Sequence, residues 1–476
     1  MSSDRTPVLA PEWLSVPDDP NDLAAGVWPI TAHRTGDGEL SIGGVAASDL
    51  RAEFGTPALL LDEEDARSRA VAAQRAFTRA AEANGTKARV YYAGKAFLSV
   101  EIARWMTDAG LGIDVASRGE LETALAAGVA PERIGFHGNN KQAHELVRAV
   151  EVGVGTVIVD SDVEIERLGT ITSRLGRTQN VLVRVRSGVH ADTHDFLATA
   201  HEDQKFGYSL ADAAGAVARI RELEGLQFLG LHCHIGSQIF GVDGFRESAA
   251  RVLELHSELL EGGDVPLMNL GGGFGIAYTR ADDPTPLAEL ARGIVAAVAE
   301  ECFRLGVALP ELAFEPGRSI IGPSGVSLYE VGTTKRVGLS GGDRTYISVD
   351  GGMSDNARPA LYGAQYSARL ASREGAGEPE LSRVVGLHCE SGDIVVDHEY
   401  LPADTAPGDL LAVPATGAYC AALSSNYNHT PRPPIVAVRG GRARLIVRGE
   451  TIDDLLARDV AYTTDAFGAD AEEGEE

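Results

Sequence analysis

The chain has 476 residues, of which 44% are hydrophobic and 23% charged, a composition typical of a globular protein with two or three domains. Acidic residues outnumber basic ones by 69 to 42, which gives a formal net charge of -27. This charge argues against nucleic acid or an anionic membrane surface as a partner, and no apolar run is long enough to span a membrane.

The cysteines and the N-terminus bear on the compartment. The cysteines are scattered and form no C-x-x-C pair: Cys233, Cys302, Cys389 and Cys420. In a chain of this length, such usage indicates reduced thiols. The first residues, MSSDR, lack the basic and then apolar pattern of a secretory signal. We therefore expect a cytoplasmic protein.

The N-terminal part of the chain precedes the first clear repeat of elements. Residues 1–25 are rich in Pro, Asp and Ser and are expected to form an extended arm. Residues 26–60 hold short apolar runs that end in a predicted strand, and we expect this segment to pack with the C-terminal domain. Residues 65–84 are rich in Ala and Arg without a breaker, which predicts a helix that ends at Gly85.

From residue 89 to residue 316, apolar β-branched runs alternate with Ala-, Glu- and Leu-rich stretches typical of helices. The expected strands are 89–93, 112–116, 133–137, 156–160, 181–186, 228–234, 267–271 and 312–316. Eight such units predict an α/β fold, a (β/α)8 TIM-like barrel over 61–316. The alternative is a doubly wound open sheet, but no G-x-G-x-x-G signature follows the first strand.

The sequence pattern changes after the last expected barrel strand. Short β-rich runs separated by Gly and Pro predict an all-β domain over 317–464, in which 453–458 is expected to be a short helix. The predicted strands of this domain are 345–349, 384–387, 410–413, 435–438 and 443–447. The acidic stretch 465–476 has little that could pack and is expected to be disordered.

Polar side chains lie at the ends of the expected barrel strands, where barrels open on one face and carry their active sites. They are Lys95, Asp114, Ser117, His137, Asp160, His234, Gly271–Gly273 and Glu315. Aromatic and small residues frame Lys95, and burial of an amine would lower its pKa and allow it to form a Schiff base with a carbonyl. The alternative is an ordinary loop lysine with its charge in water.

Two motifs suggest how a cofactor could be held. Gly271, Gly272 and Gly273 could converge backbone N–H groups on a phosphate, although a flexible turn is the alternative. In the run HCHIGSQ, His234 could stack on a flat ring and Ser237 could bind phosphate, while an H-x-H pair could also bind a metal.

Further motifs offer charged and titratable groups. Glu315 could hold a protonated pyridine nitrogen and Arg318 could bind a carboxylate or phosphate, although an internal Glu–Arg ion pair is the alternative. Cys389 stands beside Glu390 and could transfer a proton, although an inert packed thiol is the alternative. A lysine, a glycine cradle, a stacking histidine and a ring carboxylate together are the parts that a pyridoxal phosphate site needs.

These motifs resemble those of the diaminopimelate decarboxylases, fold-type III pyridoxal-phosphate enzymes with a barrel and a β domain. The resemblance covers residues 30–460. The motifs that carry it are YYAGKAF, DVASRGEL, FHGNNK, QKFG, GLHCHIGSQ, NLGGGFGIAY, EPGRS, VDGGMSDNARPALYGA, HCESGDI and PATGAYC.

The resemblance implies a role for each matching residue. Lys95 would hold the cofactor and Cys389, from the partner subunit of a homodimer, would donate a proton. The residues implied to bind the cofactor are Lys95, Asp114, His234, Ser237, Gly271, Gly272, Gly273, Glu315, Arg318 and Tyr419. Those implied to bind substrate are Arg318, Arg358, Tyr362, Glu390 and Tyr419. The implied activity is decarboxylation of meso-2,6-diaminopimelate to L-lysine, the last step of lysine biosynthesis, without a metal.

Several alternatives remain open on the sequence. The nearest is a related fold-type III decarboxylase that acts on another basic amino acid. An alanine-racemase-type activity would need a base, usually tyrosine, in place of Cys389. A barrel hydrolase could use His232 and His234 as a metal pair, although such pairs usually lie on the first strand. A regulatory homologue without activity would be expected to lack Lys95 or Cys389, and both residues are present.

Overall fold

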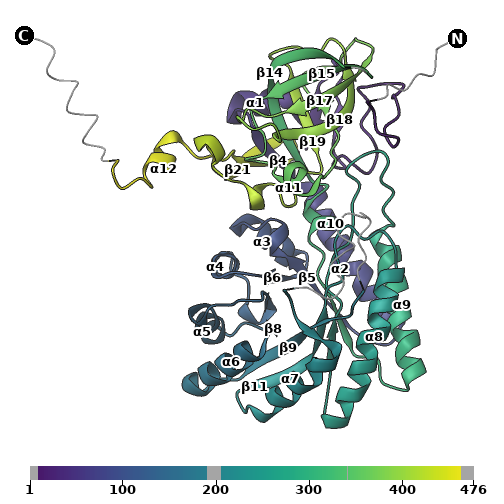
Figure 1. Cartoon of the computed structure of the whole chain (residues 1–476), viewed down its shortest axis with the longest axis vertical. Coiled ribbons are helices and arrows are strands. Elements are labelled where there is room, and N and C mark those ends of the chain that lie inside the picture. Colours follow the sequence, from purple (N-terminus) through teal and green to yellow (C-terminus); the bar gives the residue numbers. More distant parts are fainter. Residues whose placement is uncertain (1–8, 190–204, 340, 463–476) are drawn as a thin grey trace, which may run out of the picture.

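The computed structural model describes residues 9–189, 205–339 and 341–462. The stretch 465–476, expected to be disordered, and the first eight residues of the expected arm lie outside the described residues. Figure 1 shows two bodies, a barrel ringed by helices and a sheet domain at one end of it. In the described part of the chain, no helix is long and apolar enough to cross a membrane.

The barrel consists of eight parallel strands, and it closes because β8 pairs with β9 while β13 pairs with β5. Its strands are β5 (Ala88–Ala93), β6 (Gly112–Val115), β7 (Ile134–Phe136), β8 (Thr156–Val159), β9 (Gln179–Arg186), β11 (Leu226–Cys233), β12 (Leu267–Asn269) and β13 (Glu311–Phe314). The short β10 (Tyr208–Ser209) adds to the edge of β9. Each expected strand is present, and the predicted barrel is confirmed.

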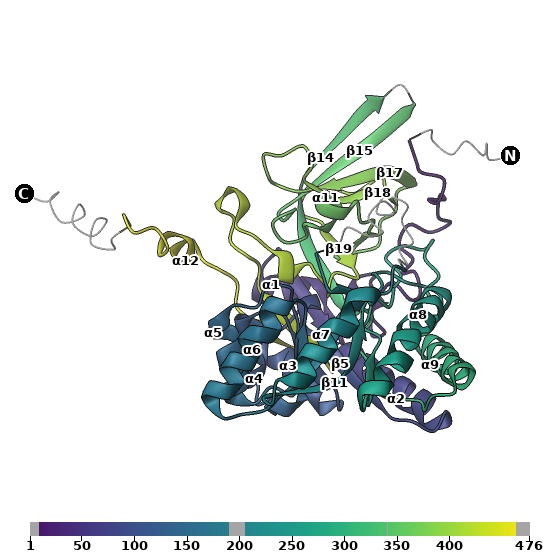
Figure 2. The same ribbon diagram turned by 60° about the horizontal axis from the view of Figure 1, so that its bottom comes forward.

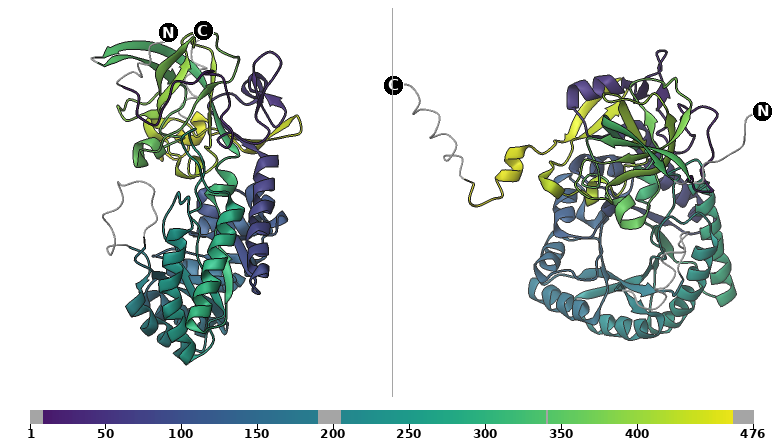
Figure 3. Two further views of the ribbon diagram at one scale, coloured as in Figure 1. Left: turned by 90° about the vertical axis from the view of Figure 1, so that its right-hand side faces the viewer. Right: turned by 45° about the horizontal axis from the view of Figure 1, so that its top comes forward.

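Helices form the outer layer, and Figures 2 and 3 show them as a ring around the strands. They are α2 (Glu63–Ala83), α3 (Val100–Asp108), α4 (Arg118–Ala126), α5 (Ala143–Val152), α6 (Asp162–Leu175), α7 (Leu210–Glu222), α8 (Asp243–Leu259) and α9 (Leu287–Leu305). Helix α2 begins where the Asp62 carboxylate accepts hydrogen bonds from the N–H groups of Glu64 and Asp65. Its alanine-rich face is buried in the main core, and α2 lies beside α9.

The second domain is built on a sheet with the strand order β18-β17-β15-β14-β4-β20-β21. These strands are β4 (Ala58–Asp62), β14 (Gly325–Leu339), β15 (Gly342–Val349), β17 (Pro379–Val385), β18 (Ile394–Pro402), β20 (Ile435–Arg439) and β21 (Arg442–Val447). In addition, β19 (Leu410–Pro414) pairs with β14 and with β16 (Arg369–Leu370). Strand β4 comes from the N-terminal segment, yet it lies between β14 and β20.

The rest of the N-terminal segment also packs against this sheet. It forms β1 (His33–Arg34), β2 (Leu40–Ile42), β3 (Val45–Ala46) and α1 (Ala47–Phe54). Its apolar side chains, among them Val27, Trp28 and Leu40, share one core with Val326 and Val436 of the sheet domain.

Short helices complete the chain, and two of them begin at residues assigned to the site. They are α10 (Arg318–Ile321), α11 (Arg358–Tyr362) and α12 (Ile452–Leu456). Helix α12 extends away from both bodies in Figure 1. Thr451 caps this helix, since its side chain accepts a hydrogen bond from the N–H of Asp454.

Candidate active site

Lys95 lies in a single 3-10 turn, η1 (Gly94–Ala96), at the carboxyl end of β5. Two hydrogen bonds hold this turn: the Tyr92 hydroxyl donates to the Phe97 carbonyl at 2.6 Å, and the Tyr419 N–H donates to the Ala96 carbonyl at 2.7 Å. The side chain of Lys95 is exposed. The burial considered from the sequence is therefore absent from this structure.

Below this turn, four polar side chains of the barrel interior meet. The His232 Nε2 atom lies 3.0 Å from Glu315 Oε1, and the His137 Nε2 atom lies 3.6 Å from the same oxygen and 3.2 Å from Asp114 Oδ1. Asp114, His232 and Glu315 are buried. Strands β6, β11 and β13 supply these three residues at or just beyond their carboxyl ends, as the sequence predicts for a barrel site.

Burial determines which of these groups carry charge. It lowers the pKa of His137 and of His232 to about 4, so both rings are neutral at neutral pH. Burial and the nearby Glu315 carboxylate raise the pKa of Asp114 well above its usual range. Desolvation alone would raise the pKa of Glu315, but the histidines beside it outweigh that effect and hold the pKa well below its usual range. Of the two carboxyl groups, Asp114 and Glu315, it is therefore Glu315 that is ionised.

The glycine loop faces this cluster from one side. The N–H of Gly272 points at His234 Nδ1 at 3.3 Å, and a Cβ atom at Gly272 would lie 2.2 Å from the Glu315 carbonyl. Gly271 adopts a φ of +70°, which favours glycine. Burial, followed by the charge of Lys95, lowers the pKa of His234 well below its usual range. The neutral ring, the loop and the lysine are thus close neighbours.

Two arginines meet around Tyr278, the last residue of the NLGGGFGIAY motif and one to which the sequence assigns no role. Arg318 donates to the Tyr278 hydroxyl and, at 2.8 Å, to the Ser237 hydroxyl. The guanidinium of Arg358 lies 4.7 Å from the centre of the Tyr278 ring, and that of Arg318 lies 4.7 Å from the centre of the Tyr419 ring. The structure therefore brings four of the expected residues, Ser237, Arg318, Arg358 and Tyr419, to one cationic patch.

The remaining expected residues lie apart from this group. Cys389 and Glu390 are exposed on a loop of the sheet domain, where the N–H of Cys389 donates to the Asn428 side chain at 3.2 Å. The side chain of Tyr362 is 66% exposed at the end of α11. Among the described residues, no hydrogen bond or ion pair joins the loop 387–391 to the barrel.

The donor set fits pyridoxal phosphate. An exposed lysine follows strand β5, the glycines of the loop leave no side chain in the way of a bound group, and an ionised carboxylate follows strand β13. The Oδ2 atom of Asp114 is buried and has no hydrogen-bond partner, which leaves it available to a bound group.

Three members of the buried polar cluster, His137, His232 and Glu315, also form the one candidate metal site within the described ranges. One ligand atom each of His137, His232 and Glu315 lie within 4.8 Å of one another. His234 is not part of this set, so the histidine pair considered from the sequence, His232 with His234, is not the pair that the structure brings together.

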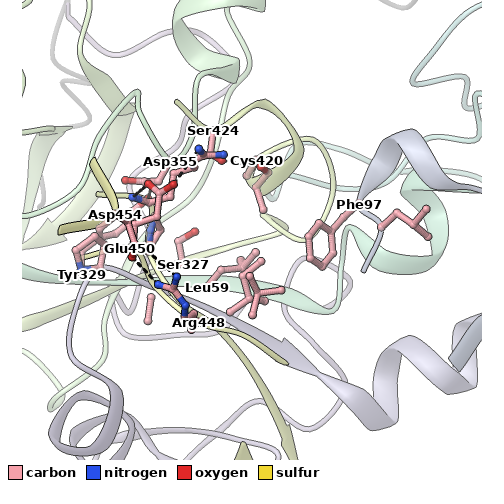
Figure 4. A pocket seen from close by; sticks show the side chains of 18 residues that line it. Leu59, Phe97, Ser327, Tyr329, Asp355, Cys420, Ser424, Arg448, Glu450 and Asp454 are labelled. Atoms are coloured by element: carbon pink, nitrogen blue, oxygen red, sulfur yellow. Dashed lines mark hydrogen bonds and ion pairs between the residues drawn. The ribbon is translucent and has the colours of Figure 1, made fainter. Parts of the chain in front are cut away.

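A cavity of about 550 Å³ lies beside the site, between the C-terminal segment and strands β4 and β14 (Figure 4). Phe97, two residues after Lys95, and Cys420, directly after Tyr419, are among the residues that line it. Arg448 and Asp454 of the C-terminal segment, which form an ion pair, also line it. Lys95 and Glu315 do not line this cavity, so it is separate from the cluster described above.

Some polar residues of the site carry a weak signal in the sequence or none. His137 lies at a predicted strand end but has no neighbours that indicate a role, and Tyr278 lies in the same motif as the glycine loop, where its spacing alone does not mark it. Arg184, inside β9, is half-buried, and its charge contributes to lowering the pKa of His137. Ser117 is the N-cap of α4, because its side chain accepts from the N–H of Glu120.

Comparison with known proteins identifies the family. The family model for the pyridoxal binding domain of pyridoxal-dependent decarboxylases matches residues 70–322. A diaminopimelate decarboxylase from Mycobacterium tuberculosis is 50% identical over 447 residues, which is 92% of this chain and 98% of the relative. The chain belongs to the diaminopimelate decarboxylase family. The family member from Bacillus subtilis is 43% identical and covers 91% of this chain.

Solved structures of the family agree with this assignment. The crystal structure of diaminopimelate decarboxylase from M. jannaschii has a TM-score of 0.84 and 32% identity, and it covers 90% of this chain and 98% of that chain. The same enzyme has been solved in complex with L-lysine, with a TM-score of 0.83 to this chain. The fold class, the resemblance and the pyridoxal phosphate cofactor predicted from the sequence are confirmed.

Proposed function

We propose that the chain is a carboxy-lyase that converts meso-2,6-diaminopimelate to L-lysine and carbon dioxide, the last step of lysine biosynthesis, with pyridoxal phosphate as cofactor. The observation that carries this proposal is the set of groups around the end of β5: the Lys95 turn, the ionised Glu315 and the glycine loop. Family relatives of this name, 43–50% identical over nearly the whole chain, support the same substrate. A decarboxylase for another basic amino acid is not favoured.

Different residues of the barrel would bind different parts of the cofactor. Lys95 would bind it covalently through its amine, and Ser237 with the loop Gly271–Gly273 would contact the phosphate. His234 would pack on the ring, while Glu315 would keep a proton on the ring nitrogen and Asp114 would contribute a further polar contact. When bound, the cofactor supplies a sink for the electrons that remain when carbon dioxide leaves.

Substrate recognition falls to the cationic patch and to the exposed residues of the sheet domain. Arg318 and Arg358 would bind substrate carboxylates, because a guanidinium offers a planar fork that matches them. Tyr362 and Tyr419 would supply further contacts, and Glu390 would pair with the distal ammonium group. A buried arginine left without a carboxylate is costly, which would reject shorter or neutral amines.

A homodimer would complete the site. Cys389, Glu390 and Tyr362 are exposed in a single chain, and large apolar side chains in the same region are exposed as well: Leu361 by 60%, Leu387 by 47% and Tyr427 by 39%. A surface of this kind favours burial by a partner. We therefore propose that Cys389 of one protomer donates the proton that replaces carbon dioxide in the site of the other, in the cytoplasm.

The experiment that tests the function compares three purified proteins: wild type, Lys95→Ala and Lys87→Ala. Lys87 is an exposed lysine at the opposite end of the same strand and serves as a matched control. We expect wild type and Lys87→Ala to be yellow and to release carbon dioxide from meso-diaminopimelate, and Lys95→Ala to do neither. A yellow wild type that is inactive on diaminopimelate but active on lysine, ornithine or arginine would overturn the substrate assignment.

A further inference from the structure

Asn269 is the last residue of β12, and it lies between the two parts of the site that are proposed to hold opposite ends of the cofactor. Its side chain is buried, with 3% exposed. The Nδ2 atom donates to Glu315 Oε1 at 2.7 Å, and the Oδ1 atom accepts from the N–H of Gly271 at 2.8 Å. One amide group therefore touches both the ring carboxylate and the glycine loop.

A backbone hydrogen bond also joins the two residues that the Asn269 side chain contacts. The N–H of Glu315 donates to the carbonyl of Gly271 at 2.9 Å, so Glu315 and Gly271 are joined directly as well as through Asn269. Asn269 also pairs with His232 across β11 and β12, and His232 Nε2 lies 3.0 Å from the same carboxylate oxygen. Oε1 of Glu315 is thus held from two neighbouring strands.

The orientation of the amide follows from its partners. A backbone N–H can only donate, so the side-chain atom that faces Gly271 must be the oxygen. The nitrogen must then face Glu315, where it can only donate. An aspartate at this position would keep the contact with Gly271 but would place a carboxylate against a carboxylate, which is unfavourable for two buried groups.

We infer that Asn269 is a positioning residue for the cofactor site, whose amide fixes the Glu315 carboxylate and the Gly271 backbone relative to each other. This inference rests on the proposed contact of Glu315 with the ring nitrogen. It explains why a polar side chain is buried at the end of a barrel strand: the amide satisfies two groups that would otherwise have to be fixed separately. Losing it frees the carboxylate to rotate and the loop to shift.

The test uses two variants that separate the two hydrogen bonds. Asn269→Ala removes both of them, while Asn269→Asp keeps the acceptor for Gly271 and removes the donor to Glu315. Asn180→Ala is the matched control, because Asn180 donates a comparable bond to the Gly155 carbonyl near the amino end of strand β9, away from the site. Bound cofactor is followed by the visible absorbance of each holoenzyme over a dilution series, and kcat and KM are measured separately.

We expect Asn269→Ala to bind pyridoxal phosphate about tenfold more weakly, which matches the loss of hydrogen bonds to a charged group. Asn269→Asp should show an altered visible band and a lower kcat with little change in KM, and Asn180→Ala should match wild type in every readout. Cofactor affinity and absorbance within twofold of wild type in both Asn269 variants would overturn the inference. So would a lower thermal midpoint with unchanged cofactor binding, which indicates a merely structural role.

The cofactor affinities and the visible spectra do not depend on the substrate. If wild type is yellow but inactive on diaminopimelate, the proposed function fails while the cofactor affinities of the variants still decide the role of Asn269. A wild type that stays colourless with added pyridoxal phosphate overturns both.

Discussion

The backbone N–H of Tyr419, in the sheet domain, donates a hydrogen bond of 2.7 Å to the carbonyl of Ala96, the residue directly after Lys95. Tyr419 makes this bond with a φ of +64°, a conformation that is costly for a residue with a side chain. Its ring lies 4.7 Å from the Arg318 guanidinium. One residue of the second domain therefore fixes the position of the lysine turn and a wall of the cationic patch.

Replacing Tyr419 tests whether its backbone and its ring act separately. Glycine keeps the N–H and accepts the positive φ, so we expect Tyr419→Gly to retain visible absorbance. Loss of the ring beside Arg318 should raise KM for diaminopimelate by about tenfold. Tyr419→Phe keeps the ring and should stay close to wild type in KM. Equal damage in both variants would mean that the hydroxyl, and not the ring, is responsible.

Complementation between two inactive variants tests the shared site. Lys95→Ala and Cys389→Ala should each be inactive alone, with Cys389→Ala still yellow. Coexpressed, they should recover about a quarter of wild-type activity, because random pairing in a two-fold dimer makes half of the dimers mixed, each with one complete site. Coexpression of Lys95→Ala with Lys95→Arg is the control that cannot complement. A dimeric mixture without recovered activity would contradict the donation of Cys389 across the interface.

Arg358 should be sensitive to a change that preserves its charge. Its Nη1 atom donates to the Tyr366 hydroxyl at 2.5 Å, and its plane lies over Tyr278. Lysine has no planar fork, so Arg358→Lys is expected to lower kcat/KM by at least about tenfold. The control is Arg89→Lys at the far end of the barrel, where Arg89 forms an exposed pair with Glu311, and its kinetics should not change.

Metal removal separates the decarboxylase from a barrel hydrolase. The ligand atoms of His137, His232 and Glu315 are close enough to bind an ion. Under the proposed function, dialysis against a chelator should leave carbon dioxide release unchanged, and elemental analysis should find far less than one metal ion per chain. Stoichiometric metal whose removal abolishes activity would contradict the assignment of Glu315 to the ring nitrogen.

The buried histidines predict how stability depends on pH. His137 and His232 have a pKa of about 4 in the folded chain, below their usual value of 6.5. Between these values the unfolded chain binds protons that the folded chain does not, so stability falls as pH drops from about 6.5 to about 4. The free energy of unfolding changes by about 1.4 kcal/mol for every tenfold difference in proton affinity between the two states. The raised pKa of Asp114 offsets part of the loss.

Thermal midpoints across this pH range check the prediction. The midpoint of His232→Gln, which cannot titrate there, should fall less steeply than that of wild type. His144→Gln, a change at an exposed histidine, should follow wild type. Parallel curves for all three proteins would show that the buried ring does not control the acid sensitivity.

The barrel was predictable because its strands contain short apolar runs that are buried on both faces, as in 157–159 and 181–183. The strands of the sheet domain were harder to predict from the sequence. Strand β14 was missed because its first residues are all buried while its second half, with Lys335 and Arg336, is mostly exposed, so no single pattern runs along it. Strand β18 carries Asp397, His398 and Glu399 in its middle, which hides its β character.

The residues of the site also differ in how far the sequence predicts their positions. Residues at or just beyond the carboxyl ends of barrel strands, such as Asp114 and Glu315, could be placed from the sequence because the barrel gathers these ends on one face. Tyr278 could not, since its contacts with Arg318 and Arg358 depend on how the two domains meet. Neither could the exposure of Lys95, which depends on where the 3-10 turn leaves the strand.

The position of β4 has a consequence for synthesis of the chain. Leu60 pairs with Val326 on one side and with Val436 on the other, so both partners are translated hundreds of residues after it. At typical elongation rates, a fully buried strand would wait on the order of tens of seconds for its neighbours. During that time its apolar side chains and both of its edges are exposed to other nascent chains. The domain that supplies Tyr419 and Cys389 therefore cannot form until almost the whole polypeptide has been made.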